Sequence, residues 1–201
     1  MKIIGITGGV GCGKSEVIRY IMKNYRCYVI FADDVAKQLQ QKGNICYDSI
    51  VNLLGETILS LDGEIDKVKM AETIFADEKL LLKVNNIIHP AVYDYVEEKI
   101  KEYKKQTEID FFIIEAALLI ECGYGKIVDE MWYVYTADEI RRERLKNSRG
   151  YSDEKINQIF TSQLSYEEFR KASTFMLDNG GTIENTQKQI DNKLEEYLCQ
   201  K

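Results

Sequence analysis

A glycine-rich segment near the start of the sequence has the residue types and the spacing of a loop that binds nucleotide phosphates. It follows the pattern Gly8-x-x-x-x-Gly13-Lys14-Ser15. Its glycines permit backbone angles and close approaches that side chains would block, so successive backbone amides can surround phosphate groups. The Lys14 ammonium can then reach the β and γ phosphates, and the Ser15 hydroxyl can ligate Mg²⁺. The pattern therefore predicts an enzyme that uses a nucleoside triphosphate.

The expected contacts with the nucleotide extend over most of this loop. The loop lies between a predicted strand and a predicted helix, which is the context in which the pattern binds phosphate. The same context argues against a glycine-rich turn that binds nothing. Lys14 is expected to be catalytic as well, whereas Cys12 and Glu16 contribute through their backbone. The expected nucleotide contacts are Gly9, Gly11, Cys12, Gly13, Lys14, Ser15 and Glu16.

Asp33 follows an apolar run at 27–31 that reads as a strand. In an open α/β sheet this places its carboxylate at the edge where ligands bind, and such a group can accept or orient the proton of an attacking hydroxyl. Alternatively, Asp33 or Asp34 caps a helix that begins near Val35. The residues alone leave these two roles open.

Glu115 follows a second apolar run, at 111–114. An acidic residue at this position of a phosphate-loop fold orders the Mg²⁺ shell through water. The alternative is a carboxylate at a strand end that has no metal nearby.

Four arginines lie on one predicted helix and at its exit. Arginine offers forked donors to phosphate and stabilises charge in a transition state. Charged runs are more often solvated helix faces, so we expect one or two of the four to be functional. The four are Arg141, Arg142, Arg144 and Arg149.

His89 is the single histidine and lies beside the single proline, Pro90. A lone histidine is more often a packed or capping residue than a catalyst, and no serine or cysteine nucleophile stands at a readable spacing from it.

Alternating apolar runs and helical patterns predict a parallel five-stranded sheet with helices on both faces, an α/β fold of three α/β/α layers. The predicted strands are 2–6, 27–31, 110–114, 131–135 and 174–177, and a helix is predicted over 16–23. The segment between the second and third strands is too long for an ordinary crossover and contains a helical pattern over 77–103. We expect a core at about 1–40, 108–136 and 172–201, a helical insertion at about 41–107 and a helical lid at about 137–171.

Composition restricts the class of partner and the compartment. The chain has 201 residues, 45% of them hydrophobic, and a net charge of −6, which leaves no basic surface for nucleic acid and favours a small-molecule partner. Its five cysteines form no zinc or disulfide pattern and read as reduced thiols in the cytoplasm. The short apolar run at the start predicts neither export nor membrane insertion. Oligomeric state is left open.

Beyond the phosphate loop, an ordered set of motifs resembles the dephospho-CoA kinase family over almost the whole chain. The loop alone is typical of a much larger superfamily of P-loop NTPases, whereas the ordered set is specific. The matching segments are 5–15, 32–39, His89-Pro90, 118–121, Arg144-Leu145, Gln163 and 178–180.

The resemblance implies transfer of the γ-phosphoryl group of ATP to the 3′-hydroxyl of dephospho-CoA, the last step of CoA synthesis, with Mg²⁺. It also implies a core, a helical acceptor-side region and a mobile lid. Asp33 then faces the acceptor hydroxyl, and His89, Leu118 and Glu121 fall where the family shapes the acceptor site. Arg144 is assigned to catalysis, and Arg141 and Arg149 to the nucleotide.

The chain departs from the family pattern at four places. Phe31 stands where the family has an aspartate, and Ala117 where it has a proline. The second lid arginine, Arg149, lies one place late, and Ser173-Thr174 replace an Ala-Asp pair.

Two other functions are compatible with parts of the sequence. A kinase of another small acceptor, such as a nucleoside, a nucleotide or a shikimate-like alcohol, would share the loop, the lid and the strand-end carboxylate. A GTP-dependent switch would need a guanine-reading Asn/Thr-Lys-x-Asp motif after a strand. The nearest Asn-Lys pair, Asn192-Lys193, lies in the final predicted helix and is followed by Leu-Glu.

Overall fold

The polypeptide divides into two units in the computed structural model, which describes residues 1–75, 77–105 and 108–199. The first unit comprises residues 1–29 and 103–201, and the second comprises residues 30–102. The domain limits predicted at 107 and at 201 lie outside the described residues. The division into core, insertion and lid stays a prediction.

A five-stranded parallel sheet is the centre of the fold, as predicted. Its strands in spatial order are β2 (Cys27–Phe31), β3 (Phe111–Glu115), β1 (Lys2–Thr7), β4 (Glu130–Tyr135) and β5 (Phe175–Asp178). The runs are rich in β-branched and aromatic residues, which favour strands. The central β1 is buried over almost its whole length, as expected for a strand with layers on both faces.

The register of the central strands shows which helices cover each face. Phe111 pairs with Lys2 on one face and contacts the rings of Tyr25, which ends α1 (Lys14–Asn24), and of Tyr197 in α9 (Ile183–Leu198). On the other face, Tyr133 pairs with Thr7 and stacks on Phe169 of α8 (Tyr166–Ala172) at 4.8 Å. Because alternate residues of a strand point to opposite faces, helices cover both faces of the sheet and form the predicted three layers.

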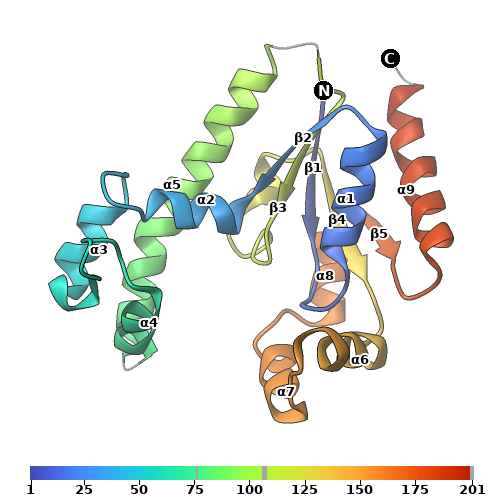
Figure 1. Ribbon diagram of the computed structural model, residues 1–201. Helices are drawn as coiled ribbons and strands as arrows, with labels where there is room; N and C mark the ends of the chain where they lie inside the picture. The colour runs from blue at the N-terminus through green and yellow to red at the C-terminus, as the bar shows by residue number, and fades with distance from the viewer. Residues whose placement is uncertain (76, 106–107, 200–201) are drawn as a thin grey trace. The chain divides into compact units, whose positions relative to one another are not determined.

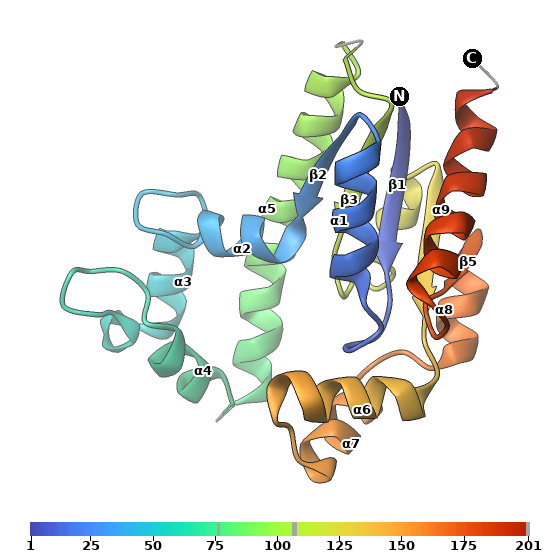
Figure 2. The ribbon, with the colours of Figure 1, turned by 45° about the vertical axis from the view of Figure 1, so that its right-hand side comes forward.

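Helices α1 and α9 lie side by side (Figure 1), and the turned view agrees (Figure 2). They are joined by Asp191, whose carboxylate accepts hydrogen bonds from the Tyr20 hydroxyl at 2.8 Å and from the Tyr25 hydroxyl at 2.7 Å. Burial and the bond to Asp191 raise the pKa of Tyr20 to about 12. The hydroxyls therefore stay protonated and act as donors at neutral pH.

The segment predicted as a lid forms three short helices, α6 (Asp138–Arg149), α7 (Asp153–Thr161) and α8. Gly150 ends α6 in the left-handed conformation that favours glycine. The Ser152 hydroxyl caps α7, and Ser165 and Glu168 form a capping box on α8. Local sequence signals thus explain where these helices begin and end.

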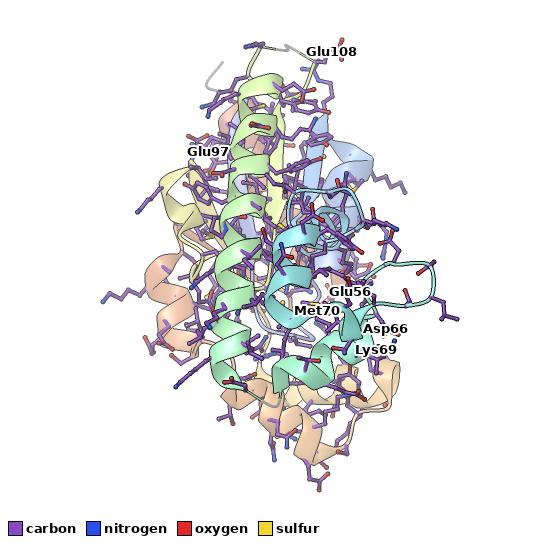
Figure 3. The ribbon with its side chains drawn as sticks, turned by 90° about the vertical axis from the view of Figure 1, so that its left-hand side faces the viewer. Glu56, Asp66, Lys69, Met70, Glu97 and Glu108 are labelled. Atoms are coloured by element: carbon purple, nitrogen blue, oxygen red, sulfur yellow. The ribbon has the colours of Figure 1, made fainter. Side chains whose placement is uncertain are left out.

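The second unit is helical. Its elements are α2 (Ala32–Leu39), α3 (Tyr47–Leu54), η1 (Glu56–Ile58), α4 (Lys67–Phe75) and most of α5 (Glu78–Tyr103). Asp66 precedes α4 and accepts the Met70 amide hydrogen bond through its carbonyl, while Lys69 donates to the Leu59 carbonyl at 2.6 Å (Figure 3). Ile50 of α3 and Ile58 of η1 are fully buried, and these two elements pack against each other.

No helix in the described part of the chain is long and apolar enough to cross a lipid bilayer.

Replacing Asp191 with asparagine is expected to lower the free energy of unfolding by about 1–3 kcal/mol, because hydrogen bonds to a charged acceptor are weakened. Urea denaturation measures this change. The exposed neighbour Asn192→Ala serves as the control, and an equal effect of both substitutions would contradict the role of Asp191.

The tyrosine pKa also predicts a pH dependence. The pKa of Tyr20 is raised in the fold from 10.0 to about 12, so its contribution to stability is complete below pH 10 and is lost as the pH rises toward 12. Unfolding curves over this range should show a smaller alkaline loss for Asp191→Asn than for the unchanged protein.

Candidate active site

The glycine loop joins β1 to α1 and contains three glycines with positive φ, Gly8, Gly11 and Gly13. Gly11 has φ 85° and Gly13 has φ 90°, a region that suits glycine. Gly13 precedes α1, and its carbonyl accepts the Glu16 amide hydrogen bond at 3.0 Å. The N-terminus of α1, where backbone amides and the helix dipole favour an anion, therefore lies at the loop.

Side chains approach this loop so closely that some glycines have no room for a Cβ atom. A Cβ at Gly9 would overlap the Arg141 guanidinium, and one at Gly13 would overlap the Asn179 amide. The glycine pattern is therefore required by neighbouring side chains as well as by phosphate.

Lys14 and Glu115 lie together at the carboxyl ends of β1 and β3. The Lys14 ammonium donates to the Gly8 carbonyl at 2.7 Å and lies 3.8 Å from the Glu115 carboxylate. Register pairs Ile6 with Glu115, which explains how the strand end brings this carboxylate to the loop. An ammonium group and a carboxylate thus share this edge of the sheet.

The Cys12 carbonyl receives three donors from outside the loop. It accepts hydrogen bonds from the Asn179 side-chain amide at 2.8 Å, the Thr136 hydroxyl at 3.1 Å and Arg144 Nη1 at 3.4 Å. Asn179 follows β5, Thr136 follows β4 and Arg144 lies in α6. The carbonyl is therefore held in one direction from three segments.

Val10, at the tip of the loop, is held by two side chains of the segment predicted as a lid. Arg141 Nε donates to the Val10 carbonyl at 3.0 Å, and the Val10 amide donates to Gln163 Oε1 at 3.1 Å. Arg141 Nη2 donates to the same Gln163 oxygen at 2.8 Å, and its guanidinium lies 4.1 Å from the Phe160 ring centre. Arg141 and Gln163 together join the tip of the loop to α6 and to the region between α7 and α8.

The other two arginines of the predicted group contact the lid segment itself. Arg142 donates to Asp153 at 2.8 Å and to Asn157 at 2.7 Å. Arg149 is the exposed last residue of α6 and lies over the Tyr151 ring at 5.9 Å. Of the four arginines, Arg141 and Arg144 are the two that the structure brings to the loop.

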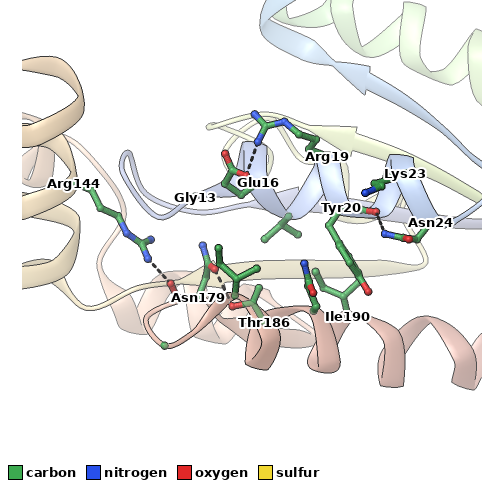
Figure 4. A pocket seen from close by; sticks show the side chains of 14 residues that line it. Gly13, Glu16, Arg19, Tyr20, Lys23, Asn24, Arg144, Asn179, Thr186 and Ile190 are labelled. Carbon is green, nitrogen blue, oxygen red and sulfur yellow. Dashed lines mark hydrogen bonds and ion pairs between the residues drawn. The ribbon is translucent and has the colours of Figure 1, made fainter.

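A cavity of about 610 Å³ begins at the loop and continues between α1 and α9. Gly13, Arg144 and Asn179 line the cavity beside the loop, and Tyr20 and Ile190 line it farther along the two helices (Figure 4). The cavity thus adjoins the first turn of α1, where anions bind.

Asp33 lies in the second unit, in the first turn of α2. This helix begins at Ala32, directly after β2, and Phe31 precedes it without a side-chain cap. The prediction that Asp33 or Asp34 caps a helix beginning near Val35 is wrong, because both aspartates already lie within the helix. Asp34 instead accepts a hydrogen bond from Lys37 at 2.6 Å.

The remaining predicted residues occupy a helix and a turn. His89 lies half-buried within α5, in the second unit. Leu118 and Glu121 are exposed in the turn that follows β3, where the Cys122 amide donates to the Leu118 carbonyl at 2.9 Å. Backbone hydrogen bonds shape this turn although Ala117 replaces the proline of the family pattern.

Thr136, Gln163 and Asn179 contact the loop but were given no role from the sequence. Thr136 and Asn179 each come directly after a strand, at the edge where ligands bind. That position was an available signal for both. Asn179 and Gln163 also belong to the motif set that resembles the family, and this was the signal for Gln163, which lies in a connection between helices.

The Ser173-Thr174 departure lies at the opposite end of the sheet. The Met131 amide donates to the Thr174 hydroxyl oxygen at 3.0 Å, and this hydroxyl donates to Glu130 at 2.6 Å. Ser173 donates to the Phe169 carbonyl at 2.7 Å. These bonds attach the start of β5 to β4 and do not belong to the loop.

Comparison with known proteins finds relatives over nearly the whole length. The family model described as dephospho-CoA kinase matches residues 2–185. A dephospho-CoA kinase from Aquifex aeolicus is 37% identical over 196 residues, which are 98% of this chain and 97% of the relative. One from Carboxydothermus hydrogenoformans is 35% identical over 190 residues, 94% of this chain and 91% of the relative.

Solved structures share the fold. The crystal structure of TT1252 from Thermus thermophilus aligns with a TM-score of 0.80 at 26% identity and 97% coverage of both chains. Dephospho-CoA kinase from Campylobacter jejuni aligns with a TM-score of 0.73 at 22% identity, covering 98% of this chain and 97% of that one. Shikimate kinase from Acinetobacter baumannii aligns with a TM-score of 0.52 at 14% identity, covering 98% and 94%. The predicted P-loop kinase fold is confirmed.

The loop cysteine is expected to resist alkylation. Cys12 is 1% exposed, and burial raises the pKa of its thiol, which lowers the amount of reactive thiolate. Iodoacetamide labelling followed by peptide mass spectrometry should modify the exposed Cys199 first and Cys12 after unfolding. Equal rates for the two cysteines would contradict the buried position of Cys12, and Cys199→Ser should remove the fast phase.

Proposed function

The chain belongs to the dephospho-CoA kinase family, and we propose that it transfers the γ-phosphoryl group of ATP to the 3′-hydroxyl of dephospho-CoA. The observation that carries this proposal is the family match over nearly the whole chain, joined to a phosphate loop with Lys14, Glu115 and two arginines around it. The acceptor oxygen forms a bond to the γ-phosphorus, and the bond from that phosphorus to the bridging oxygen breaks. ADP leaves with the electron pair.

The triphosphate is proposed to lie in the glycine loop at the start of α1. Backbone amides of the first helical turn and the helix dipole favour anions there. The Lys14 ammonium lies beside the loop and donates to the Gly8 carbonyl at 2.7 Å. We propose that it gives up this hydrogen bond and donates to the β and γ phosphates when ATP binds. The cavity that Gly13 and Asn179 line is proposed to take the adenosine part of ATP.

Ser15 and Glu115 have the chemistry of Mg²⁺ ligands. Ser15 presents an exposed hydroxyl in the first turn of α1, and Glu115 presents a carboxylate beside Lys14; oxygen groups of this kind, together with phosphates and water, suit the ion. When bound, Mg²⁺ neutralises charge on the β and γ phosphates.

Arg144 is proposed to stabilise the charge that develops on the transferred group. Its guanidinium lies beside Gly13 and donates to the Cys12 carbonyl, and forked arginine donors suit phosphoryl oxygens. Arg141 and Arg149 are proposed as further contacts to ATP. Arg141 is already at the loop through Val10, while Arg149 would have to leave the Tyr151 ring.

Asp33 is proposed to accept or orient the proton of the acceptor hydroxyl. It comes two residues after the end of β2, a strand of the sheet, and ligands of open α/β sheets bind beyond the carboxyl ends of the strands. The neighbouring Asp34 is engaged by Lys37, which favours Asp33 for this role.

The acceptor is proposed to contact His89, Leu118 and Glu121. Leu118 and Glu121 support this because their side chains are exposed in the turn after β3. With a net charge of −6, we expect a small-molecule acceptor, no nucleic acid and a cytoplasmic protein.

Purified protein mixed with ATP, Mg²⁺ and dephospho-CoA is expected to produce CoA and ADP. Mass spectrometry detects the added phosphoryl group, and shikimate or a nucleoside in place of dephospho-CoA serves as the comparison. ADP formation that these other acceptors stimulate and dephospho-CoA does not would reject the proposal.

Asp33→Asn is expected to lower kcat by about 10²–10⁴, the usual contribution of a general acid or base. Its affinity for ATP should stay unchanged, because Asp33 is not among the loop residues. Asp34→Asn is the matched control and should retain activity. Normal turnover of Asp33→Asn would remove Asp33 from the proposed role.

A further inference from the structure

Asn179 uses all four of its hydrogen-bonding groups, and each bond leads to a different segment. Its backbone amide donates to the Tyr135 carbonyl at 2.8 Å, and its side-chain Nδ2 donates to the Cys12 carbonyl at 2.8 Å. Its backbone carbonyl accepts from Arg144 Nη2 at 2.8 Å, and its Oδ1 accepts from the Thr186 hydroxyl at 2.9 Å. Asn179 therefore connects the sheet, the phosphate loop, α6 and α9.

Thr186 determines which way the Asn179 amide points. Thr186 is buried in α9, 5% exposed, and the shortest contact of its hydroxyl is with Asn179 Oδ1. Among the three acceptors near the Thr186 hydroxyl, Asn179 Oδ1 is the nearest, so the oxygen side of the amide faces Thr186. Figure 4 shows this bond between the Asn179 and Thr186 side chains. The NH₂ side is then turned toward the Cys12 carbonyl.

The bond to Cys12 has a consequence for the next residue, Gly13. The Cys12 carbonyl and the Gly13 amide belong to one peptide unit, which is planar and trans, so they point in opposite directions. Holding the carbonyl toward Asn179 directs the Gly13 N–H away from it. This amide immediately precedes α1, at the end of the helix that attracts phosphate.

Asn179 also orients the lid arginine. Arg144 Nη2 donates to the Asn179 carbonyl, while its Nη1 lies at the Cys12 carbonyl and at the Thr136 hydroxyl, 3.4 and 3.3 Å away. Two edges of the guanidinium are thus fixed, and the flat group is restricted to one plane beside Gly13.

We propose that Asn179 is a positioning residue, held by Thr186, that sets the Gly13 amide and the Arg144 guanidinium for the β and γ phosphates of the nucleotide. This inference rests on the proposed use of the loop to bind ATP. It predicts that Asn179 affects binding of the outer phosphates rather than of the base, although Asn179 lines the cavity.

The first test compares ADP with AMP as competitors of a fluorescent ATP analogue. Asn179→Ala is expected to lower the affinity for ADP about tenfold, which is the cost of one lost hydrogen bond in a network. The affinity for AMP should fall by less than about threefold. Equal weakening of ADP and AMP would overturn the inference, since it would indicate a contact with the base or a general loss of structure. The control is Asn185→Ala, which changes an exposed asparagine of α9.

The second test uses Thr186, which lies outside the loop and is a gentler change. Thr186→Val keeps the shape of the side chain and removes the hydroxyl, so the affinity for ADP is expected to fall about threefold. Thr186→Ser keeps the hydroxyl and should bind ADP as tightly as the unchanged protein. Unchanged ADP affinity in Thr186→Val would overturn the orienting role of this hydroxyl, even if Asn179→Ala failed to fold.

A double-mutant cycle with Arg144 tests whether Asn179 positions this arginine or only packs against the loop. As a single substitution, Asn179→Ala is expected to lower kcat about tenfold with little change in KM for dephospho-CoA. In an Arg144→Ala background the same substitution should lower kcat much less, because the two residues act together. Fully additive effects on kcat would reject the positioning of Arg144 by Asn179. The binding tests contain no dephospho-CoA, so an ADP-specific loss would support the inference even if the proposed acceptor proved wrong.

Discussion

A phosphate-binding loop has to expose its own backbone, and a backbone built largely from glycine cannot hold its shape by itself. In this protein the shape is supplied from outside. The Cys12 carbonyl is held by Asn179, Thr136 and Arg144, while Val10 is held through both its amide and its carbonyl. The same side chains leave no room for a Cβ at two of the glycines, so the loop and its supports form one structural unit.

This dependence explains what could be predicted from the sequence. The five strands lie within one residue of their predicted limits, because short β-branched and aromatic runs indicate strands locally. The loop was evident from its spacing, and Glu115 from the end of its strand. The donors to the Cys12 carbonyl could not be predicted, since they lie 124 to 167 positions away. The cap assigned to the aspartates was wrong because α2 follows β2 without a connection.

The two units carry different parts of the proposed chemistry. The first unit holds the loop, Lys14, Glu115 and the arginines, which are proposed to offset the charge of the triphosphate. The second unit holds Asp33 and His89, proposed for the acceptor. The division between them falls within β2, between Val29 and Ile30, and Asp33 follows this strand directly, in the first turn of α2.

The contacts of Cys12 also bear on when the loop gains its supports during synthesis. The glycine loop leaves the ribosome long before Asn179, because Cys12 and Asn179 are 167 positions apart in the chain, and before the α9 residues Thr186 and Asp191. Contacts between distant parts of a chain form late because closing long loops costs entropy. The nascent chain therefore carries the glycine loop without these supports until the segment around Asn179 and α9 has been made.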